Sequence, residues 1–250
     1  MANKLIVIFY LFLSAICFSQ VRKKLTVDYT LYISDQVGVT DSQNSQILKG
    51  IVKESGNVYF RLYINDTISY FIENNGISSS NLSTQLAINK SKYSTPIYFN
   101  TDKTFIFNNN PNFIFFHKNE FLIRKEQIKN WNVTKEKKII DGKSCYKATT
   151  SDYFYNNKSA KIEYEVTAWF CPQIPINFGP VYYNDLPGLI LEISYLDVTL
   201  VATKITLELE EKKIIKPYGI NKISIDEYSI KLSDKITEMI EEADIQEGKK

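Results

Sequence analysis

The sequence has 250 residues, with 30 Lys and Arg against 28 Asp and Glu, and its formal net charge of +2 disfavours a nucleic-acid-binding protein. Its hydrophobic content of 44% is too high for a disordered chain and sufficient for a substantial core. One His and three Cys are too few for a His/Cys metal cluster, so we expect neither a metal nor a cofactor.

Residues 1–19 have the pattern of a secretory signal peptide. Lys4 precedes an apolar run over 5–18, and a basic, polar stretch follows directly. The run is too short to span a bilayer comfortably, and no later stretch approaches 18 apolar residues. We therefore expect cleavage after Ser19 and export to the periplasm, the outer membrane or the medium, without a transmembrane segment in the mature chain. An uncleaved membrane anchor and a lipid-modified Cys17 are the alternatives.

The body of the chain alternates apolar and polar residues with the period of two that half-buried strands show. Residues 24–33 are apolar at every odd-numbered position, and 58–64 repeats the pattern. Residues 78–89 are polar and weakly patterned, which predicts a loop or a single helical turn. Further strands rich in Val, Ile, Thr, Tyr and Phe are predicted over 69–73, 95–99, 104–107, 112–118, 120–125, 146–153, 161–170, 189–195 and 199–209.

About ten closely spaced strands favour a mainly β fold, with a single curved antiparallel sheet of half-barrel shape. No Pro- or Gly-rich linker divides the chain, so we expect one domain whose β part covers 20–218. Residues 219–250 are predicted to form a C-terminal α-helix and a frayed tail within the same domain. Ser224 and Glu227 have the spacing of a capping box. The predicted apolar stripe of this helix, which we expect to pack on the sheet, consists of Tyr228, Leu232, Ile236, Met239 and Ile240.

Two cysteines, Cys145 and Cys171, follow the predicted signal peptide. A turn cluster surrounds residue 158, midway between them, so residues whose numbers sum to 316 face each other across a predicted hairpin. Directly opposed Cβ atoms lie about 4.5–5.5 Å apart, which needs little closing for a disulfide. We predict a stapling disulfide, with two buried free thiols as the alternative. The absence of a Cys-x-x-Cys motif disfavours a redox-active pair.

The segment 168–193 carries a family resemblance. An Ala168-Trp169-Phe170 strand precedes an Ile-Pro pair, a Gly-Pro turn and the run Asp185-Leu186-Pro187-Gly188-Leu189-Ile190. This order and spacing resemble the GLPGLI family of exported proteins, which is common in Bacteroidota, with Asp185 in place of the first Gly. The resemblance implies no activity, because the function of that family is not established. The signature residues singled out are Trp169, Pro175, Gly179, Pro180, Leu186, Pro187, Gly188, Leu189 and Ile190.

The signature has a structural interpretation. Asp is among the least costly residues at positive φ, so a turn at Asp185 survives the departure from the family pattern. Pro187 and Gly188 suit the central positions of a type II turn, in which the Gly has positive φ. We therefore expect the segment to build a tight bend against the sheet rather than a binding site.

Residues with a potential for catalysis are few. No Gly-x-Ser-x-Gly, His-Glu-x-x-His or phosphate-binding glycine loop accompanies His117. Glu163 and Glu165 share a strand face. Charged residues in this pattern more often mark an exposed strand face than a catalytic carboxylate pair. A candidate ligand face consists of Tyr59, Arg61 and Tyr63, with an ordinary outer sheet face, where Tyr is common, as the alternative.

These patterns favour a non-enzymatic envelope binding factor whose partner is an envelope protein, a peptide or a hydrophobic small molecule. A carboxylate-dependent envelope hydrolase and a purely structural interaction protein are the alternatives. An apolar cavity inside the sheet would favour binding. Two carboxylates facing each other about 5–9 Å apart in a cleft would favour hydrolysis.

Overall fold

The computed structural model describes residues 24–34, 42–74, 82–91, 95–100, 104–108, 115–156, 158–207 and 214–247, so the predicted signal peptide lies outside the described residues. The strands of the first half are β1 (Lys24–Ile33), β2 (Tyr59–Asn65), β3 (Ile68–Glu73), β4 (Ile97–Phe99), β5 (Thr104–Asn108) and β6 (Phe121–Glu126). The strands of the second half are β7 (Asn132–Ile140), β8 (Lys143–Tyr155), β9 (Lys161–Cys171), β10 (Leu189–Tyr195), β11 (Val198–Thr206) and β12 (Asn221–Ser224). The described helices are α2 (Ser42–Ser55), α3 (Leu82–Lys90) and α4 (Ile225–Glu247).

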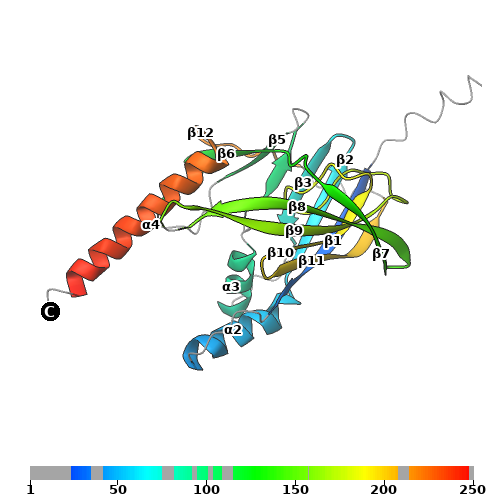
Figure 1. Cartoon of the computed structure of the whole chain (residues 1–250). Helices are drawn as coiled ribbons and strands as arrows, with labels where there is room; N and C mark the ends of the chain where they lie inside the picture. The colour runs from blue at the N-terminus through cyan, green and yellow to red at the C-terminus, as the bar shows by residue number, and fades with distance from the viewer. Residues whose placement is uncertain are drawn as a thin grey trace, which may run out of the picture.

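All twelve strands belong to one open, curved sheet with the order β12-β6-β5-β4-β3-β2-β1-β11-β10-β9-β8-β7. Neighbouring strands are antiparallel except β12, which runs parallel to β6. Figure 1 shows α4 leaving the sheet beside β12 and β6, while α2 and α3 lie below β1 and β10. The prediction of a mainly β fold with one curved sheet and a C-terminal helix is confirmed. The sheet is mixed, however, and has twelve strands rather than about ten.

Most predicted strands are present, and the exceptions have local causes. The strand predicted over 112–118 is wrong for residues 115–118, which form a turn, and 112–114 lie outside the described residues. Two strands have no counterpart among the predictions: β12, which lies where the predicted helical region 219–250 begins, and β7. Asp141 and Gly142 both have positive φ in the turn that joins β7 to β8. Asp-Gly is a strong sequence signal for such a hairpin.

Helices α2 and α3 pack on each other, and α2 also contacts β1. No helix is predicted at 42–55, and only a loop or a single turn is predicted at 78–89. The described part of α3 buries Thr84, Ala87 and Ile88, which are spaced by three and one residues and share one helix face. This short pattern is hidden by polar neighbours, which explains the wrong prediction of a loop. Among the described helices, none is long and apolar enough to cross a membrane.

The predicted register of the β8–β9 hairpin is confirmed. Lys147 pairs with Trp169 and Thr149 with Thr167, so the residue numbers of each pair sum to 316. Cys145 and Cys171 stand one step beyond the pair of Tyr146 and Phe170, and both are buried free thiols in this structure. The disulfide is therefore not present here, and its formation stays a prediction.

Oxidation of these two cysteines is directly measurable. Burial, together with the neighbouring Cys171, raises the pKa of the Cys145 thiol to about 11, so the reduced thiol is protonated and unreactive at neutral pH. In protein purified from an oxidising compartment, we expect a disulfide, and a mass increase of two hydrogens on reduction. Intact-protein mass spectrometry under denaturing conditions, with and without reductant, makes this measurement. An unchanged mass would show that opposed strand positions alone do not bring about oxidation.

Helix α4 begins as predicted. The backbone N–H of Ser224 donates to Glu227 Oε2 (2.9 Å), and the backbone N–H of Glu227 donates to Ser224 Oγ (3.2 Å), which together form a capping box. The predicted packing of the apolar stripe is correct only at its start. Tyr228 is buried against β6 and β12, whereas Met239 and Ile240 are 44% and 41% exposed. The helix extends past the edge of the sheet, so its later turns have no sheet beneath them (Figure 1).

The capping box gives α4 a pH-dependent stability. Hydrogen bonds from the backbone and side chain of Ser224 lower the pKa of Glu227 in the folded protein. The stability that these bonds contribute is therefore fully present above the pKa of Glu227 in the unfolded chain, and it is lost as pH falls through the lower pKa of the folded state. We expect Ser224→Ala to lower the free energy of unfolding by about 1 kcal/mol near neutral pH. Its difference from the wild type should shrink as pH falls below the ordinary pKa of glutamate and approaches the lowered pKa of Glu227. Urea unfolding of both proteins across this range tests the linkage, and a pH-independent difference would contradict it.

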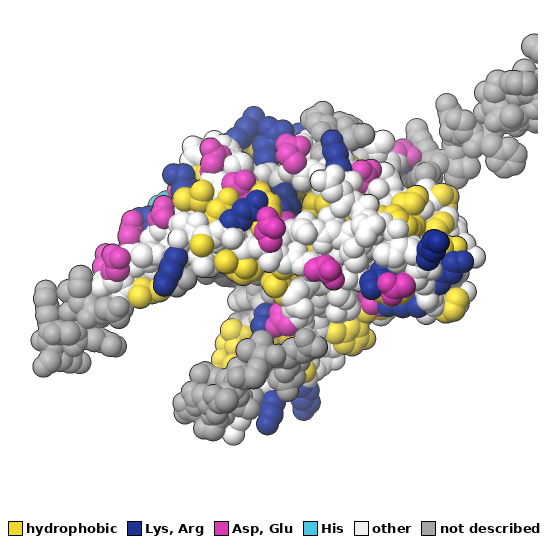
Figure 2. Space-filling view, viewed as in Figure 1, with side chains coloured by type: hydrophobic (Ala, Val, Ile, Leu, Met, Phe, Trp, Pro, Cys, Tyr) yellow, Lys and Arg dark blue, Asp and Glu magenta, His cyan; other side chains and the backbone are white. Residues whose placement is uncertain are grey.

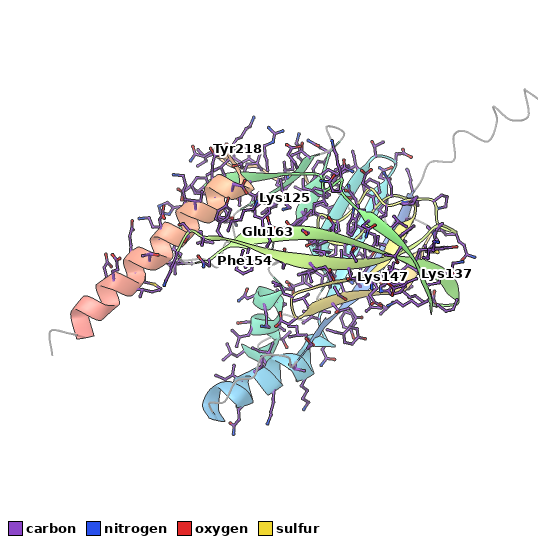
Figure 3. All side chains as sticks on the ribbon, in the orientation of Figure 1. Lys125, Lys137, Lys147, Phe154, Glu163 and Tyr218 are labelled. Carbon is purple, nitrogen blue, oxygen red and sulfur yellow. The ribbon has the colours of Figure 1, made fainter. Side chains whose placement is uncertain are left out.

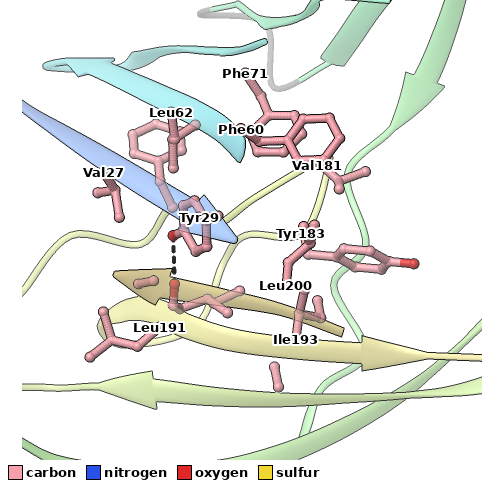
Figure 4. Close-up of a cluster of buried hydrophobic side chains, with 14 of the residues drawn as sticks. Val27, Tyr29, Phe60, Leu62, Phe71, Val181, Tyr183, Leu191, Ile193 and Leu200 are labelled. Atoms are coloured by element: carbon pink, nitrogen blue, oxygen red, sulfur yellow. Dashed lines mark hydrogen bonds between the residues drawn. The ribbon is translucent and has the colours of Figure 1, made fainter. Parts of the chain in front are cut away.

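The main core lies on the concave face of the sheet. Figure 4 shows side chains of β1, β2, β3, β10 and β11 converging there, together with Val181 and Tyr183 from the connection between β9 and β10. Tyr29 is fully buried, and its hydroxyl donates to the carbonyl oxygen of Ile190 (2.7 Å), which ties β1 to the start of β10 across the core.

Candidate functional site

The connection between β9 and β10, residues 172–188, fills the space inside the curved sheet. Its buried side chains include the hydrophobic Ile176, Phe178, Val181, Tyr182, Tyr183 and Leu186. Phe178 contacts Phe99 of β4, Tyr182 contacts Phe105 of β5, and Tyr183 contacts Tyr195 of β10. The segment therefore packs against both halves of the sheet, and the apolar interior is occupied by the chain itself.

The backbone of this segment departs from the predicted turn. Asp185 has a φ of 71°, as expected for the position that replaces the first Gly of the family pattern. The prediction of a type II turn is wrong, because Gly188 has no positive φ. Its N–H instead donates to the carbonyl oxygen of Leu186 (2.8 Å), which closes a three-residue turn centred on Pro187. A Cβ atom on Gly188 would lie 2.3 Å from the carbonyl oxygen of Cys171. The close approach of two backbones, rather than a left-handed conformation, requires glycine here.

The other signature residues divide between the core and the surface. Pro175 and Pro187 are exposed, and Trp169 is half-buried with Lys138 Nζ 4.4 Å from its ring centre. The remaining positions are buried under or within the bend: Gly179, Pro180, Leu186, Gly188, Leu189 and Ile190.

The candidate ligand face on β2 does not form one open surface. Arg61 binds both carboxylate oxygens of Asp28, with Nη2 lying 3.0 Å from Oδ2. Tyr63 is 1% exposed and packs with Tyr70, among other residues, in a separate cluster. Only Tyr59, at 42% exposure, presents much of its ring to solvent. The structure thus keeps these three residues on one strand face but leaves little of it open for a ligand.

A buried polar cluster, centred on Asp152 of β8, was not predicted. Oδ1 of Asp152 accepts a hydrogen bond from Lys125 Nζ (3.0 Å), and both side chains are nearly inaccessible. Oδ2 accepts from the hydroxyl groups of Tyr182 (2.9 Å), Tyr183 (3.2 Å) and Tyr164 (3.2 Å). Burial and the charge of Asp152 raise the pKa of Tyr164 to about 12, so its hydroxyl stays a donor. Figure 3 shows Lys125 extending from β6 toward β8.

This Asp152 cluster connects distant parts of the sheet. In the strand order, β6 and β8 are each second from opposite edges, so the ion pair of Lys125 and Asp152 bridges the two ends of the curved sheet. Tyr153, next along β8, donates to Asp226 Oδ1 (2.7 Å) at the start of α4. The cluster and its neighbour Tyr153 therefore hold together the two ends of the curved sheet and the first turn of the C-terminal helix.

A cleft of about 900 Å³ lies beside the Asp152 cluster, between the end of β6, the middle of β8 and the junction of β12 with α4. The charged residues that line it are the basic Arg124, Lys125, Lys129 and Lys222 and the acidic Glu126, Asp152, Asp226 and Glu227. Three of the four carboxylates already accept hydrogen bonds within the protein. We call this opening the mixed-charge cleft.

The residues predicted to have some catalytic potential lie elsewhere. His117 is exposed in the turn before β6, and Glu163 and Glu165 are exposed on β9. None of the three lines the mixed-charge cleft. Among the described side chains, no group of three or more His, Cys, Asp or Glu residues is arranged to hold a metal ion.

Part of the chain matches a protein family for which no activity is known. A family model described as "Protein of unknown function (Porph_ging)" matches residues 154–192, from the end of β8 through the buried segment into β10. This match is compatible with the resemblance carried by residues 168–193. No curated protein matches the chain.

Solved structures of PNGF-II in the P21 and C2 space groups are similar to this chain, with TM-scores of 0.49 and 0.46 and sequence identities of 13% and 14%. In both cases the similarity covers 85% of this chain, but only 34% and 32% of those structures. The chain thus spans about a third of their length.

Proposed function

We propose that the protein is an exported, non-enzymatic binding factor, related to the GLPGLI family, that holds a peptide segment of another envelope protein in the mixed-charge cleft. The observation that carries this proposal is the filled concave face. Because residues 172–188 occupy the apolar interior, a hydrophobic small molecule would have to displace the protein's own core. The mixed-charge cleft, at about 900 Å³, has a volume typical of ligand sites and is open to solvent.

The lining of the cleft suits a peptide. Side chains of both charge signs are present, and they match the mixture of charged and polar groups that a peptide offers. The four-residue strand β12 pairs with β6 and with no other described strand, so one of its edges has no strand partner there. An extended peptide can add to such an edge through main-chain hydrogen bonds, while adjacent side chains select its sequence.

The hydrolase alternative has less support. Glu163 and Glu165 lie outside the cleft, and the carboxylates of Asp152, Asp226 and Glu227 are engaged in hydrogen bonds that hold the fold. A carboxylate-dependent glycosidase needs a pair of such groups within reach of the substrate, and of the four cleft carboxylates only Glu126 lies outside these hydrogen bonds.

Site-specific photocrosslinking in cells that export the protein tests this proposal. A photoreactive amino acid at Ser151, an exposed residue in the cleft wall, should capture a defined envelope protein. The matched control places the same group at Glu163, which is exposed on the adjoining strand outside the cleft. Calorimetry with a synthetic peptide of the captured segment should then show binding that Ser151→Trp abolishes by filling the cleft. Equal capture at both positions, or capture of lipid alone, would contradict the proposal.

A further inference from the structure

A second, smaller cleft lies on the outer face of the sheet. Along β6, Lys125 points inward to Asp152, so Arg124 and Leu122 point to the opposite face. The cleft there has a volume of about 590 Å³, with the buried side chains of Ile106 and Leu122 in its lining. We call it the basic cleft, because the charged residues that the described part of the chain contributes to its lining are Arg124, Lys216 and Lys222.

The segment 216–219 forms one wall of the basic cleft and is held against the sheet. The side-chain amide of Asn108 donates to the carbonyl oxygen of Tyr218, which anchors the segment from β5. The backbone N–H of Ile220 donates to the carbonyl oxygen of Asn119 (3.0 Å), directly before β12 begins. The Tyr218 ring remains 72% exposed at the rim. The wall is thus fixed by its backbone, while its side chains stay accessible to a ligand.

The cations of the basic cleft are not neutralised by the described part of the chain. Arg124, Lys216 and Lys222 are exposed, and none forms an ion pair with another described residue. Figure 2 shows Lys and Arg side chains gathered at the top of the molecule, where Figure 1 places β12 and β6. Arg124 and Lys222 also border the mixed-charge cleft, so Lys216 and the apolar floor of Ile106 and Leu122 distinguish the basic cleft from it.

We propose that the basic cleft binds a phosphate-bearing anion whose apolar part rests on Ile106 and Leu122. A guanidinium group can donate two parallel hydrogen bonds to phosphate oxygens, and the two lysines add point charges around the same group. A multiply charged phosphate matches three cations better than a single carboxylate does. The ligand chemistry is common to lipid head groups and to soluble phosphate esters, and the experiment separates these sources.

Vesicle sedimentation with the full mature chain tests the proposal. The protein should sediment with phosphatidylcholine vesicles that contain phosphatidic acid, and not with phosphatidylcholine alone. The triple variant Arg124→Ala, Lys216→Ala, Lys222→Ala should bind about 100-fold more weakly, since each basic residue near an anionic surface contributes about a fivefold factor. The matched control, Lys49→Ala, Lys135→Ala, Lys158→Ala, removes the same charge from exposed positions outside both clefts and should bind like the wild type.

Titration with pyrophosphate by calorimetry distinguishes the two sources. Binding of pyrophosphate that is lost in the cleft variant would assign a soluble phosphate ester, and sedimentation without pyrophosphate binding would assign a lipid head group. Equal weakening of sedimentation by the two triple variants would overturn the proposal, because attraction by net charge alone would then explain binding. Failure to bind either probe would also overturn it.

The two clefts share Arg124 and Lys222, so their functions have to be separated. Ser151→Trp fills only the mixed-charge cleft, and it should leave phosphate binding unchanged. Lys216→Ala alters only the basic cleft, and it should weaken phosphate binding without affecting capture at Ser151. Either proposal can therefore fail while the other stands.

Discussion

Asp152→Ala is expected to lower the free energy of unfolding by about 3–5 kcal/mol, a large share of the stability of a single domain. The substitution removes the only ion-pair partner that the described residues provide for the buried Lys125 ammonium group. It also removes the acceptor for three tyrosine hydroxyl groups, and unsatisfied buried donors add to the cost. Urea unfolding, followed by tyrosine and tryptophan fluorescence, measures the change.

Two comparisons separate the buried charge from a general loss of packing. Asp226→Ala removes a half-buried acceptor of the Tyr153 hydroxyl, and it should cost only about 1 kcal/mol. The double variant Lys125→Met, Asp152→Ala should be more stable than Asp152→Ala alone, because no charge is then left unpaired in the interior. A double variant that is less stable than the single one would show that the lysine is not the source of the penalty.

Only part of the Asp152 cluster could be predicted from the sequence. The predicted hairpin register places Asp152 opposite Tyr164, so one hydrogen bond of the cluster follows from local pattern alone. Lys125 belongs to β6, at the other end of the sheet. The alternation of apolar and polar residues within a strand cannot predict that these two distant strands come into contact. Tyr182 and Tyr183 belong to an irregular segment whose path depends on the space inside the sheet. The contacts that could not be predicted are those set by the curvature of the whole sheet.

The same distinction applies to the elements. The predicted limits of β1 are correct at both ends because its two-residue alternation is long and uninterrupted. The strand β12 has only four residues, and its parallel pairing with β6 depends on contacts made around β6 rather than on its own pattern. For the clefts, strand alternation already places Arg124 and Lys125 on opposite faces, but only the fold shows that Arg124 lies in one cleft with Lys216.

Gly188→Ala is expected to destabilise the protein by at least about 3 kcal/mol, near the upper end of the usual range for an added methyl group. A Cβ atom at this position would lie 2.3 Å from the carbonyl oxygen and 2.5 Å from the carbonyl carbon of Cys171. Both atoms belong to the backbone, so no side-chain rotation relieves the contact. The end of β9 and the start of β10 would have to separate, and the pairing of Leu189 with Cys171 would be lost.

Gly56→Ala is the matched control, because its Cβ atom would meet only one tyrosine ring carbon, at 4.0 Å. This variant should be neutral or slightly stabilising, by about 0.4–1 kcal/mol, since alanine restricts the unfolded chain more than glycine does. Thermal and urea unfolding of the two variants give the comparison. If Gly188→Ala unfolds at the same midpoint as Gly56→Ala, the close approach at Cys171 is not what requires glycine at this position. If it unfolds much earlier, the glycine of the signature segment is explained by strand packing, and its presence gives no reason to assign a ligand to the bend.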